Sequence, residues 1–281
     1  MVQKILINYA NDAFKKAQKI NSKTGMDVGE FDRVIEYSPK GIDKKFYGKN
    51  KHILTQLRGG GYWLWKPYII LKTLMRKDIK DGDFIFYTDS GSYFINKIDH
   101  IIDLSKKYKQ DIICFGSHSG LMEKKWTKRD AFILMNLDKK RYTITSQIGA
   151  GFILTRKSKF SIKFFNEYLK YSQDERIITD SCSKLGKNYR GFIENRHDQS
   201  IFSLLSKKYK LKIFRQPSQI GNSEIKDWED KYPQIIVSTR KNDRTFFEKI
   251  KYQRGCSKSL LDFNYRILKM IFKKIIVDKK L

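Results

Sequence analysis

Proline, cysteine and histidine are scarce in this chain, whose 281 residues include 4 Pro, 3 Cys and 4 His. So few prolines exclude a proline-rich linker. The cysteines are odd in number and widely spaced (Cys114, Cys182 and Cys256), so neither a disulfide framework nor a zinc cluster is expected. No apolar run reaches the ~18 residues of a transmembrane helix, and the N-terminal segment lacks the long apolar stretch of a signal peptide. We therefore expect a cytoplasmic protein.

Acidic residues are also few, since 30 Asp and Glu stand against 58 Lys and Arg and give a formal net charge of +28. Such a charge is typical of a protein that binds nucleic acid, of one that lies on an anionic membrane, or of an AT-rich genome that inflates the lysine content. The basic residues are 44 Lys and only 14 Arg, spread along the whole chain. Because nucleic-acid readers favour the bidentate Arg fork, nucleic acid is the least favoured partner.

The aromatic content of 14% argues against disorder, and periodicity predicts an α/β protein. Expected strands are Lys4–Tyr9, Phe31–Tyr37, Phe84–Thr88, Asp111–Gly116 and Lys212–Phe214, with Ile144–Thr155 as a strand pair broken by glycines. Expected helices include Phe94–Tyr108, Ser158–Tyr171 and a basic amphipathic one over Asn264–Lys280. Strands alternate with helices in the first part of the chain, which favours a mixed, mostly parallel sheet flanked by helices.

Asp89 directly follows the uncharged strand Phe84–Thr88, in the run Asp89-Ser-Gly-Ser92. Ligands of open α/β sheets bind at this edge, and a carboxylate there can hold a divalent cation that bridges two phosphates. Ser90 and Gly91 belong to the same turn. The alternative is an ordinary turn aspartate beside a glycine.

The run Arg58-Gly-Gly-Gly-Tyr-Trp-Leu-Trp-Lys-Pro67 is the second candidate. Its glycines permit close approach of the backbone to a ligand. Arg58 and Lys66 can meet phosphate charge, and the aromatic members Tyr62, Trp63 and Trp65 can stack on a base or a sugar. The spacing to lysine is not that of a P-loop. The alternative is a packed aromatic corner with a flexible loop.

Two further segments carry candidate residues. Arg196-His197-Asp198-Gln199 directly precedes an apolar helical stretch, and it is either part of a sugar site or a simple helix cap formed by Asp198. Gly149-Ala-Gly151 either lines the floor of a substrate site or permits tight packing.

Together these motifs resemble bacterial glycosyltransferases of the GT-A type, especially capsule and lipopolysaccharide enzymes with the pattern RGxGYWxWKPxxI, DGDxxxYxDxG and a distal HDQS. Here the three motifs are Arg58–Ile70, Asp81–Gly91 and His197–Ser200, and the resemblance spans roughly residues 1–240. It extends distantly to the retaining galactosyltransferases and glycogenins, in which a DxD binds metal and donor phosphates. The resemblance places Asp89 at the DxD, but Gly91 stands where its second Asp would be, so Mn²⁺ or Mg²⁺ is a possible cofactor only.

The resemblance also assigns roles to the other candidates. Asp198 and Gln199 take the place of the pair beside the anomeric carbon, which slightly favours retention over inversion. Tyr9 and Ala10 stand where such enzymes contact the nucleotide base. Arg58, Tyr62, Lys66, Asp89, Ser90 and Gly91 complete the expected nucleotide-sugar site, and contacts to acceptor or sugar are expected from Trp63, Trp65, Lys128, Gly149 and His197.

The resulting expectation is a GT-A-like (Rossmann-like) catalytic domain over 1–250, with a nucleotide-binding half (about 1–115) and an acceptor half (about 116–250), followed by a basic tail over 251–281. It would move a sugar from a nucleotide-sugar, UDP-linked by preference, to a surface glycan or lipid-linked acceptor at the inner face of the plasma membrane. The alternatives are a nucleic-acid-binding module, a nucleotidyl- or phosphotransferase on a similar sheet, and a catalytically dead binding protein.

Overall fold

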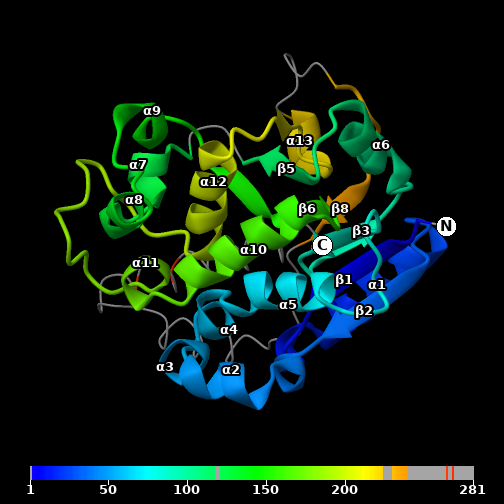
Figure 1. The fold of residues 1–281 in the computed structure, drawn as a ribbon, viewed down its shortest axis with the longest axis horizontal. Coiled ribbons are helices and arrows are strands. Elements are labelled where there is room, and N and C mark those ends of the chain that lie inside the picture. The colour runs from blue at the N-terminus through cyan, green and yellow to red at the C-terminus, as the bar shows by residue number, and fades with distance from the viewer. Residues whose placement is uncertain (1, 118–120, 224–229, 240–263, 265–267, 269–281) are drawn as a thin grey trace.

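A computed structural model describes residues 2–117, 121–223 and 230–239, together with Asn264 and Leu268. Its main sheet has six strands in the order β2-β1-β3-β6-β5-β7, and β6 runs antiparallel to the other five (Figure 1). The strands of this sheet are β1 (Lys4–Tyr9), β2 (Arg33–Tyr37), β3 (Phe84–Thr88), β5 (Ile112–Gly116), β6 (Ile148–Arg156) and β7 (Ile213–Phe214). The predicted mixed, mostly parallel α/β sheet is therefore confirmed.

Helices cover both faces of the sheet, and a second sheet pairs β4 (Ser92–Phe94) with β8 (Ile236–Ser238). The longer helices are α1 (Lys15–Asp27), α5 (Trp65–Leu74), α6 (Asp99–Lys107), α10 (Lys159–Ser172) and α12 (Asp198–Lys208). The short ones are η1 (Asp12–Phe14), η2 (Pro39–Gly41), α2 (Lys44–Lys49), α3 (Lys51–Leu54), α4 (Gly59–Tyr62), α7 (Glu123–Trp126), α8 (Arg129–Leu134), α9 (Lys140–Thr143), α11 (Glu175–Ile178) and α13 (Gln219–Ser223).

Alternation along each strand divides the core into two clusters. In β1, Ile5 and Ile7 pack into the cluster that contains the buried sides of α5, α10 and α12. Leu6, between them, packs into the opposite cluster with residues of α6. This is the period-2 pattern of a strand buried on both faces. In Figure 1, α10 and α5 cross in front of the sheet.

Most strand predictions agree with the structure within two residues, but the expected strand pair over Ile144–Thr155 is wrong. The structure has one continuous strand there, β6, which pairs antiparallel with β3 and with β5. Gly149 and Gly151 lie inside this strand rather than at a turn. Glycine is a weak strand former, so the sequence predicts a break here, yet the ladders on both sides of β6 hold it extended.

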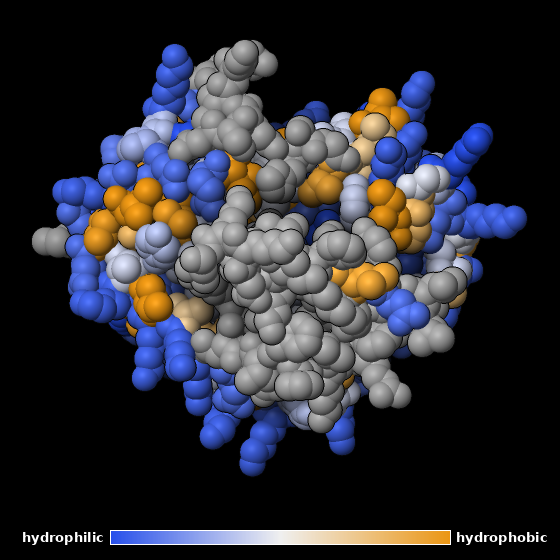
Figure 2. All heavy atoms as spheres, turned by 180° about the vertical axis from the view of Figure 1, so that it is seen from behind, coloured by the Kyte–Doolittle hydropathy of each residue, from blue (hydrophilic) through white to orange (hydrophobic). Residues whose placement is uncertain are grey.

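The predicted helix over Phe94–Tyr108 is shorter in the structure, because Ser92–Phe94 forms β4 and α6 begins at Asp99. The predicted C-terminal amphipathic helix and the tail over 251–281 lie outside the described residues, apart from Asn264 and Leu268. Within the described part of the chain, every helix is too short or too polar to cross a bilayer. Seen from behind (Figure 2), hydrophilic side chains project around the outline, and hydrophobic residues appear in separate small groups.

The glycine run forms a turn with an unusual backbone conformation. Five successive residues, 59 to 63, have positive φ, from Gly59 (61°) to Trp63 (59°). A Cβ on Gly61 (φ 95°) would lie 2.6 Å from the backbone Cα of Leu54, whereas a Cβ on Gly60 (φ 60°) would meet nothing closer than 3.8 Å. The two glycines are therefore required for different reasons, space at Gly61 and conformation alone at Gly60.

We predict that Gly60→Ala lowers the free energy of unfolding by about 1–2 kcal/mol, the cost of a left-handed alanine. Gly61→Ala adds a backbone clash to this cost and should lower it by about 3 kcal/mol or more. Urea denaturation of the two variants beside wild type measures both values. Equal losses in the two variants would contradict the packing argument.

Candidate functional site

A cleft of about 550 Å³ opens at the carboxyl edge of the main sheet. Tyr9 ends β1 there and Asp89 follows β3, while Gly149 belongs to the beginning of β6, which reaches the same edge because it runs antiparallel. The cleft is lined by Tyr9, Asn11, Phe14, Arg58, Gly59, Gly60, Trp63, Trp65, Lys66, Tyr87, Asp89, Ser90, Gly91, Ser117, Leu121, Gly149, Ala150, Gly151, Phe152, Arg196, His197, Asp198, Gln199, Gln216, Ile220 and Ser238.

The aromatic wall of the cleft comes from the glycine run and from β1. The indole N–H of Trp65 donates to the carbonyl of Gly59 (2.9 Å), which fixes the ring at the start of α5. Tyr9 stacks on Trp65 with ring centroids 3.8 Å apart and planes 12° apart. One face of the Tyr9 ring is therefore covered by protein, and Trp65 is mostly buried.

The floor of the cleft holds a cation between two carboxylates. The ammonium of Lys66 lies 2.6 Å from Asp198 Oδ2 and 3.7 Å from Asp89 Oδ1. The side chains of Lys66 and Asp198 are 4% and 5% exposed, whereas that of Asp89 is 54% exposed and faces the cleft. Asp89 is thus the open carboxylate of this cluster, and Asp198 is the enclosed one.

Burial and charge act in opposite directions on the cluster. Burial alone lowers the pKa of the Lys66 ammonium, but Asp198 and Asp89 outweigh it and the net shift of that pKa is upward. Burial raises the pKa of the Asp198 carboxyl, and the Lys66 charge opposes this rise. Lys66 is therefore a cation at neutral pH, and it favours the ionised form of the enclosed carboxyl.

Two buried phenols complete the floor. The hydroxyl of Tyr87 donates to Asp89 Oδ1 (2.6 Å), and that of Tyr168 donates to Asp198 Oδ2 (3.3 Å). Burial raises the pKa of both phenols well above the usual value, so both remain protonated donors. Asp89 is also held through its backbone N–H, which donates to the carbonyl of Gly151 (2.9 Å).

The orientation of Gln199 is fixed by a buried chain of hydrogen bonds. Its Nε2 donates to Gln147 Oε1 (2.8 Å). Gln147 Nε2 in turn donates to Glu123 Oε2 (3.3 Å) and to the carbonyl of Trp126 (3.1 Å), which are both acceptors only. Glu123 is fully buried and paired with Lys207 at 2.6 Å. Because these acceptors require a nitrogen from Gln147, its oxygen faces Gln199, whose own oxygen is left for the cleft.

His197 is buried at the start of α12 in an unusual backbone conformation (φ 53°, ψ −120°). Its Nδ1 lies 2.7 Å from the carbonyl of Ile178, an acceptor, so Nδ1 carries the proton. The ring packs against Trp63, with centroids 5.4 Å apart. Burial, aided by the charge of Arg58, lowers the pKa of His197 to about 3, so the imidazole is neutral at pH 7.

Arg58 is held at the cleft by two acidic partners. Its guanidinium donates to Asp180 and Glu194, each at 2.9 Å. Because two carboxylates already surround it, Arg58 offers a diphosphate less uncompensated charge than the sequence alone indicates.

The structure brings most of the predicted site residues together. Those that line the cleft are Tyr9, Arg58, Trp63, Trp65, Lys66, Asp89, Ser90, Gly91, Gly149, His197, Asp198 and Gln199. Among the described lining residues, Ala10, Tyr62 and Lys128 do not appear. The Lys128 ammonium is buried elsewhere, where it donates to the carbonyls of Thr179 (3.2 Å) and Ser181 (2.9 Å). Tyr62 lies behind the cleft wall, against the His197 ring (4.9 Å between centroids).

Sequence reasoning missed several residues that shape the site. Tyr87 lies two residues before Asp89, on the same side of its strand, so strand periodicity could have indicated it. Gln147, Tyr168 and Glu123 carry no local signal, because only the tertiary fold brings them to Gln199 and Asp198.

The donor set fits a divalent cation poorly. Among the described residues, no group of three or more His, Cys, Asp or Glu side chains is placed to hold a metal. The space between Asp89 and Asp198 is taken by the ammonium of Lys66. His118, which follows the strand predicted over Asp111–Gly116 and is a further candidate for holding a cation, lies outside the described residues. Mg²⁺ and Mn²⁺ prefer several oxygen ligands, whereas the two carboxylates of this cluster already share an ammonium.

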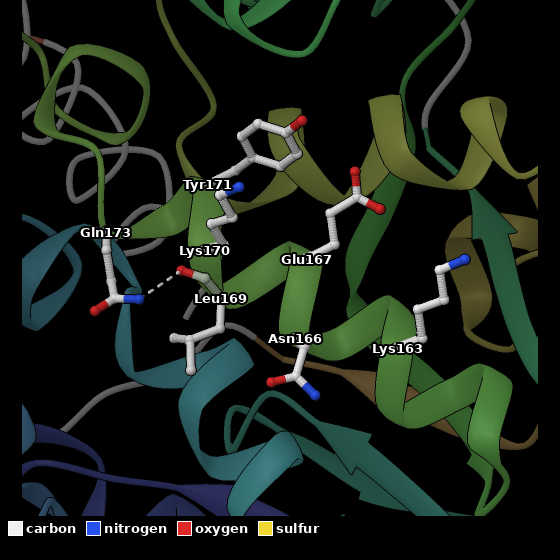
Figure 3. Close-up of a pocket in the computed structure, with 7 residues that line it drawn as sticks. All are labelled: Lys163, Asn166, Glu167, Leu169, Lys170, Tyr171 and Gln173. Carbon is white, nitrogen blue, oxygen red and sulfur yellow. Dashed lines mark hydrogen bonds between the residues drawn. The ribbon is translucent and has the colours of Figure 1, made fainter.

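A second hollow lies along the outer side of α10 (Figure 3). All its lining residues come from this helix and Gln173 directly after it, and Glu167 is already bonded to Tyr209 (2.7 Å). A ligand site normally gathers groups from several elements. The cleft at the sheet edge is therefore the stronger candidate.

Comparison with known proteins adds a likeness of shape. No family model matches the sequence, and no curated protein matches it significantly. The apo structure of mouse xyloside xylosyltransferase 1 aligns with a TM-score of 0.46 and 8% identity over 85% of this chain and 98% of that one. The apo structure of WbbM, a bifunctional glycosyltransferase, aligns with a TM-score of 0.48 and 8% identity over 95% of this chain and 52% of that one. This chain thus spans about half of WbbM, and such similarity assigns no chemistry to the cleft.

The buried neutral His197 predicts a pH-dependent stability. The unfolded chain binds a proton near pH 6.5, whereas the folded chain does so only near pH 3. The contribution of the neutral imidazole to the free energy of unfolding is therefore complete above the pKa of the unfolded state, and it is lost as the pH falls toward the folded pKa. Between pH 7 and pH 5, wild type should lose about 2 kcal/mol more of its free energy of unfolding than His197→Asn.

Urea denaturation at the two pH values measures this difference. Asparagine is tolerated at positive φ, which makes it a suitable replacement. His52→Asn, at an exposed position, is the matched control and should behave as wild type. An identical pH dependence in wild type and His197→Asn would refute the assignment.

Proposed function

We propose that this chain is a glycosyltransferase that takes a sugar from a nucleotide-sugar and transfers it to an acceptor hydroxyl. The observation that carries the proposal is the convergence of Asp89, Asp198 and Gln199 in one cleft at the carboxyl edge of the sheet. These residues come from motifs that lie more than 100 positions apart in the sequence. The aromatic wall of Tyr9 and Trp65 and the glycines of β6 supply surfaces for a base and a sugar.

The chemistry requires charge stabilisation on both sides of the bond that breaks. The bond between the anomeric carbon and the diphosphate is cleaved, and the leaving diphosphate gathers negative charge. We propose that Lys66 and Arg196 of the cleft lining stabilise this charge, each offset in part by its own carboxylate partner. The anomeric carbon becomes oxocarbenium-like, as in glycoside hydrolysis. The acceptor oxygen forms the new bond to the anomeric carbon and, under retention, passes its proton to an oxygen of the leaving diphosphate.

We assign the stabilisation of the anomeric carbon to oxygens of the Asp89, Asp198 and Gln199 group. Asp198 is enclosed by Lys66 and Tyr168, which supports an electrostatic role for it. Asp89 is open to the cleft and Gln199 presents an amide oxygen, which supports closer contact with the sugar. We favour retention, as the Asp-Gln pair suggests. Under inversion, an open carboxylate would instead take the acceptor proton.

The donor, acceptor and setting follow from the resemblance of the motifs. We propose a UDP-linked donor and a growing bacterial capsule or lipopolysaccharide glycan, or a lipid-linked precursor, as the acceptor. The protein would work in the cytoplasm, peripheral at the inner membrane face, where its excess of 58 basic over 30 acidic residues favours an anionic surface.

The first test is binding and transfer. A thermal-shift screen of UDP, GDP, CDP, CMP and ADP should show a rise in Tm with one nucleotide, since a ligand at ~100 times its Kd adds about 2.7 kcal/mol. Asp89→Asn and Asp198→Asn should each lower the rate of nucleotide release from the matching nucleotide-sugar at least about 100-fold. Asp81→Asn, on an exposed turn, is the control. Full activity in both site variants would refute the proposal.

The hydrogen bonds that connect Glu123, Gln147 and Gln199 provide a second test. Gln147→Met removes the acceptor that holds Gln199, so we expect kcat for donor cleavage to fall about 10-fold or more. The Kd for the nucleoside diphosphate should change less than twofold, because Gln147 does not line the cleft among the described residues. Gln173→Met, directly after the C-terminal end of α10 and outside the described cleft lining, is the matched control. Unchanged kcat would show that the orientation of Gln199 does not matter.

A further inference from the structure

Lys66 is a buried cation that joins two elements of the cleft. It belongs to the first turn of α5, and its ammonium contacts Asp198 at the beginning of α12 and Asp89 beyond the end of β3. It also lies 5.2 Å from the centre of the Tyr87 ring, which favours a cation at this point. A lysine with 4% of its side chain exposed is uncommon unless it is paired.

The ammonium of Lys66 also neutralises part of the negative charge of the cluster. Asp89 and Asp198 together carry two negative charges, and the ammonium of Lys66 reduces the net charge of the cluster to one negative charge. A divalent cation that bridged both carboxylates would have to occupy the space that Nζ now fills. The nearby hydroxyl of Tyr87 donates to Asp89 Oδ1, so this oxygen is already bonded.

We propose that Lys66 is the resident cation of the cleft, that it takes the position of a divalent ion between Asp89 and Asp198, and that a nucleoside diphosphate binds here without a divalent ion. The proposal rests on the proposed function for its ligand class. Its claim about the cation position stands on the geometry of three side chains alone. An ammonium that is part of the chain provides its charge at any metal concentration.

The first experiment measures nucleotide affinity by calorimetry, with the nucleoside diphosphates UDP, GDP, CDP and ADP, in EDTA and in Mn²⁺. We expect one of these nucleoside diphosphates to bind, and its Kd in EDTA should agree with its Kd in Mn²⁺ within twofold. Lys66→Met should weaken the binding of this diphosphate at least 10-fold, because the local charge becomes more negative. The binding of the corresponding uncharged nucleoside should weaken less than twofold. Lys72→Met, on the same helix but outside the described cleft lining, is the matched control for total charge.

A Kd that is at least 10-fold weaker in EDTA than in Mn²⁺ would overturn the inference and leave the proposed function standing. Failure of every nucleotide to bind, with or without Mn²⁺, would overturn the proposed function together with the diphosphate part of the inference. Loss of affinity for the nucleoside as well as the diphosphate in Lys66→Met would show a structural role only. Circular dichroism and a cooperative thermal transition check that each variant is folded.

The second experiment needs no nucleotide and keeps the cation position testable by itself. Mn²⁺ is titrated into wild type and into Lys66→Ala, with calorimetric detection. We expect no binding to wild type below about 1 mM and a new site in Lys66→Ala, where two carboxylates lose their shared cation. Tight Mn²⁺ binding by wild type that Asp89→Asn removes, or no gain in a folded Lys66→Ala, would overturn the inference. The wild-type titration decides the matter if the variant does not fold.

Discussion

The ammonium of Lys66, enclosed between Asp198 and Asp89, is the interaction on which the cleft depends. Ions that leave water need partners, and removal of one partner from a buried pair typically costs about 3–5 kcal/mol. This pair ties the first turn of α5 to the first turn of α12 at the edge where β3 ends. The buried ammonium of Lys66 therefore helps to set the position of the exposed Asp89 carboxylate, so this side of the cleft is anchored to the core.

Around that cation the cleft presents mostly oxygen acceptors whose geometry is fixed from behind. The phenol of Tyr87 orients Asp89, and the buried Glu123 orients Gln199 through Gln147. Preorganised groups of this kind stabilise developing charge without reorganisation at the moment of reaction. The aromatic side of the cleft, by contrast, is built by stacking of Tyr9 on Trp65, so shape and charge come from different elements.

The sequence predicts the fold and most of the residues that line the cleft, but it does not predict the buried residues that hold them in place. Apolar runs predict β1 and β3 with the observed bounds, because burial on both faces leaves a local imprint in the sequence. The break expected within β6 was wrong, because sheet pairing overrides the weak preference of Gly149 and Gly151. The sequence predicts that Lys66 can meet phosphate charge, but its pairing with Asp198, 132 positions away, is not encoded in local patterns.

The hydrogen-bond chain from Glu123 through Gln147 to Gln199 has a consequence for how this protein can change over evolution. Each link has a polarity, since an acceptor at one end demands a donor at the next. Replacement of Gln147 removes the acceptor of Gln199 Nε2, and replacement of Glu123 removes the carboxylate partner of Lys207. A buried polar group that loses its partner costs about 1–3 kcal/mol. The three positions are therefore constrained as a unit, and a sequence that alters one of them should alter its neighbours in compensation or lose the chain altogether.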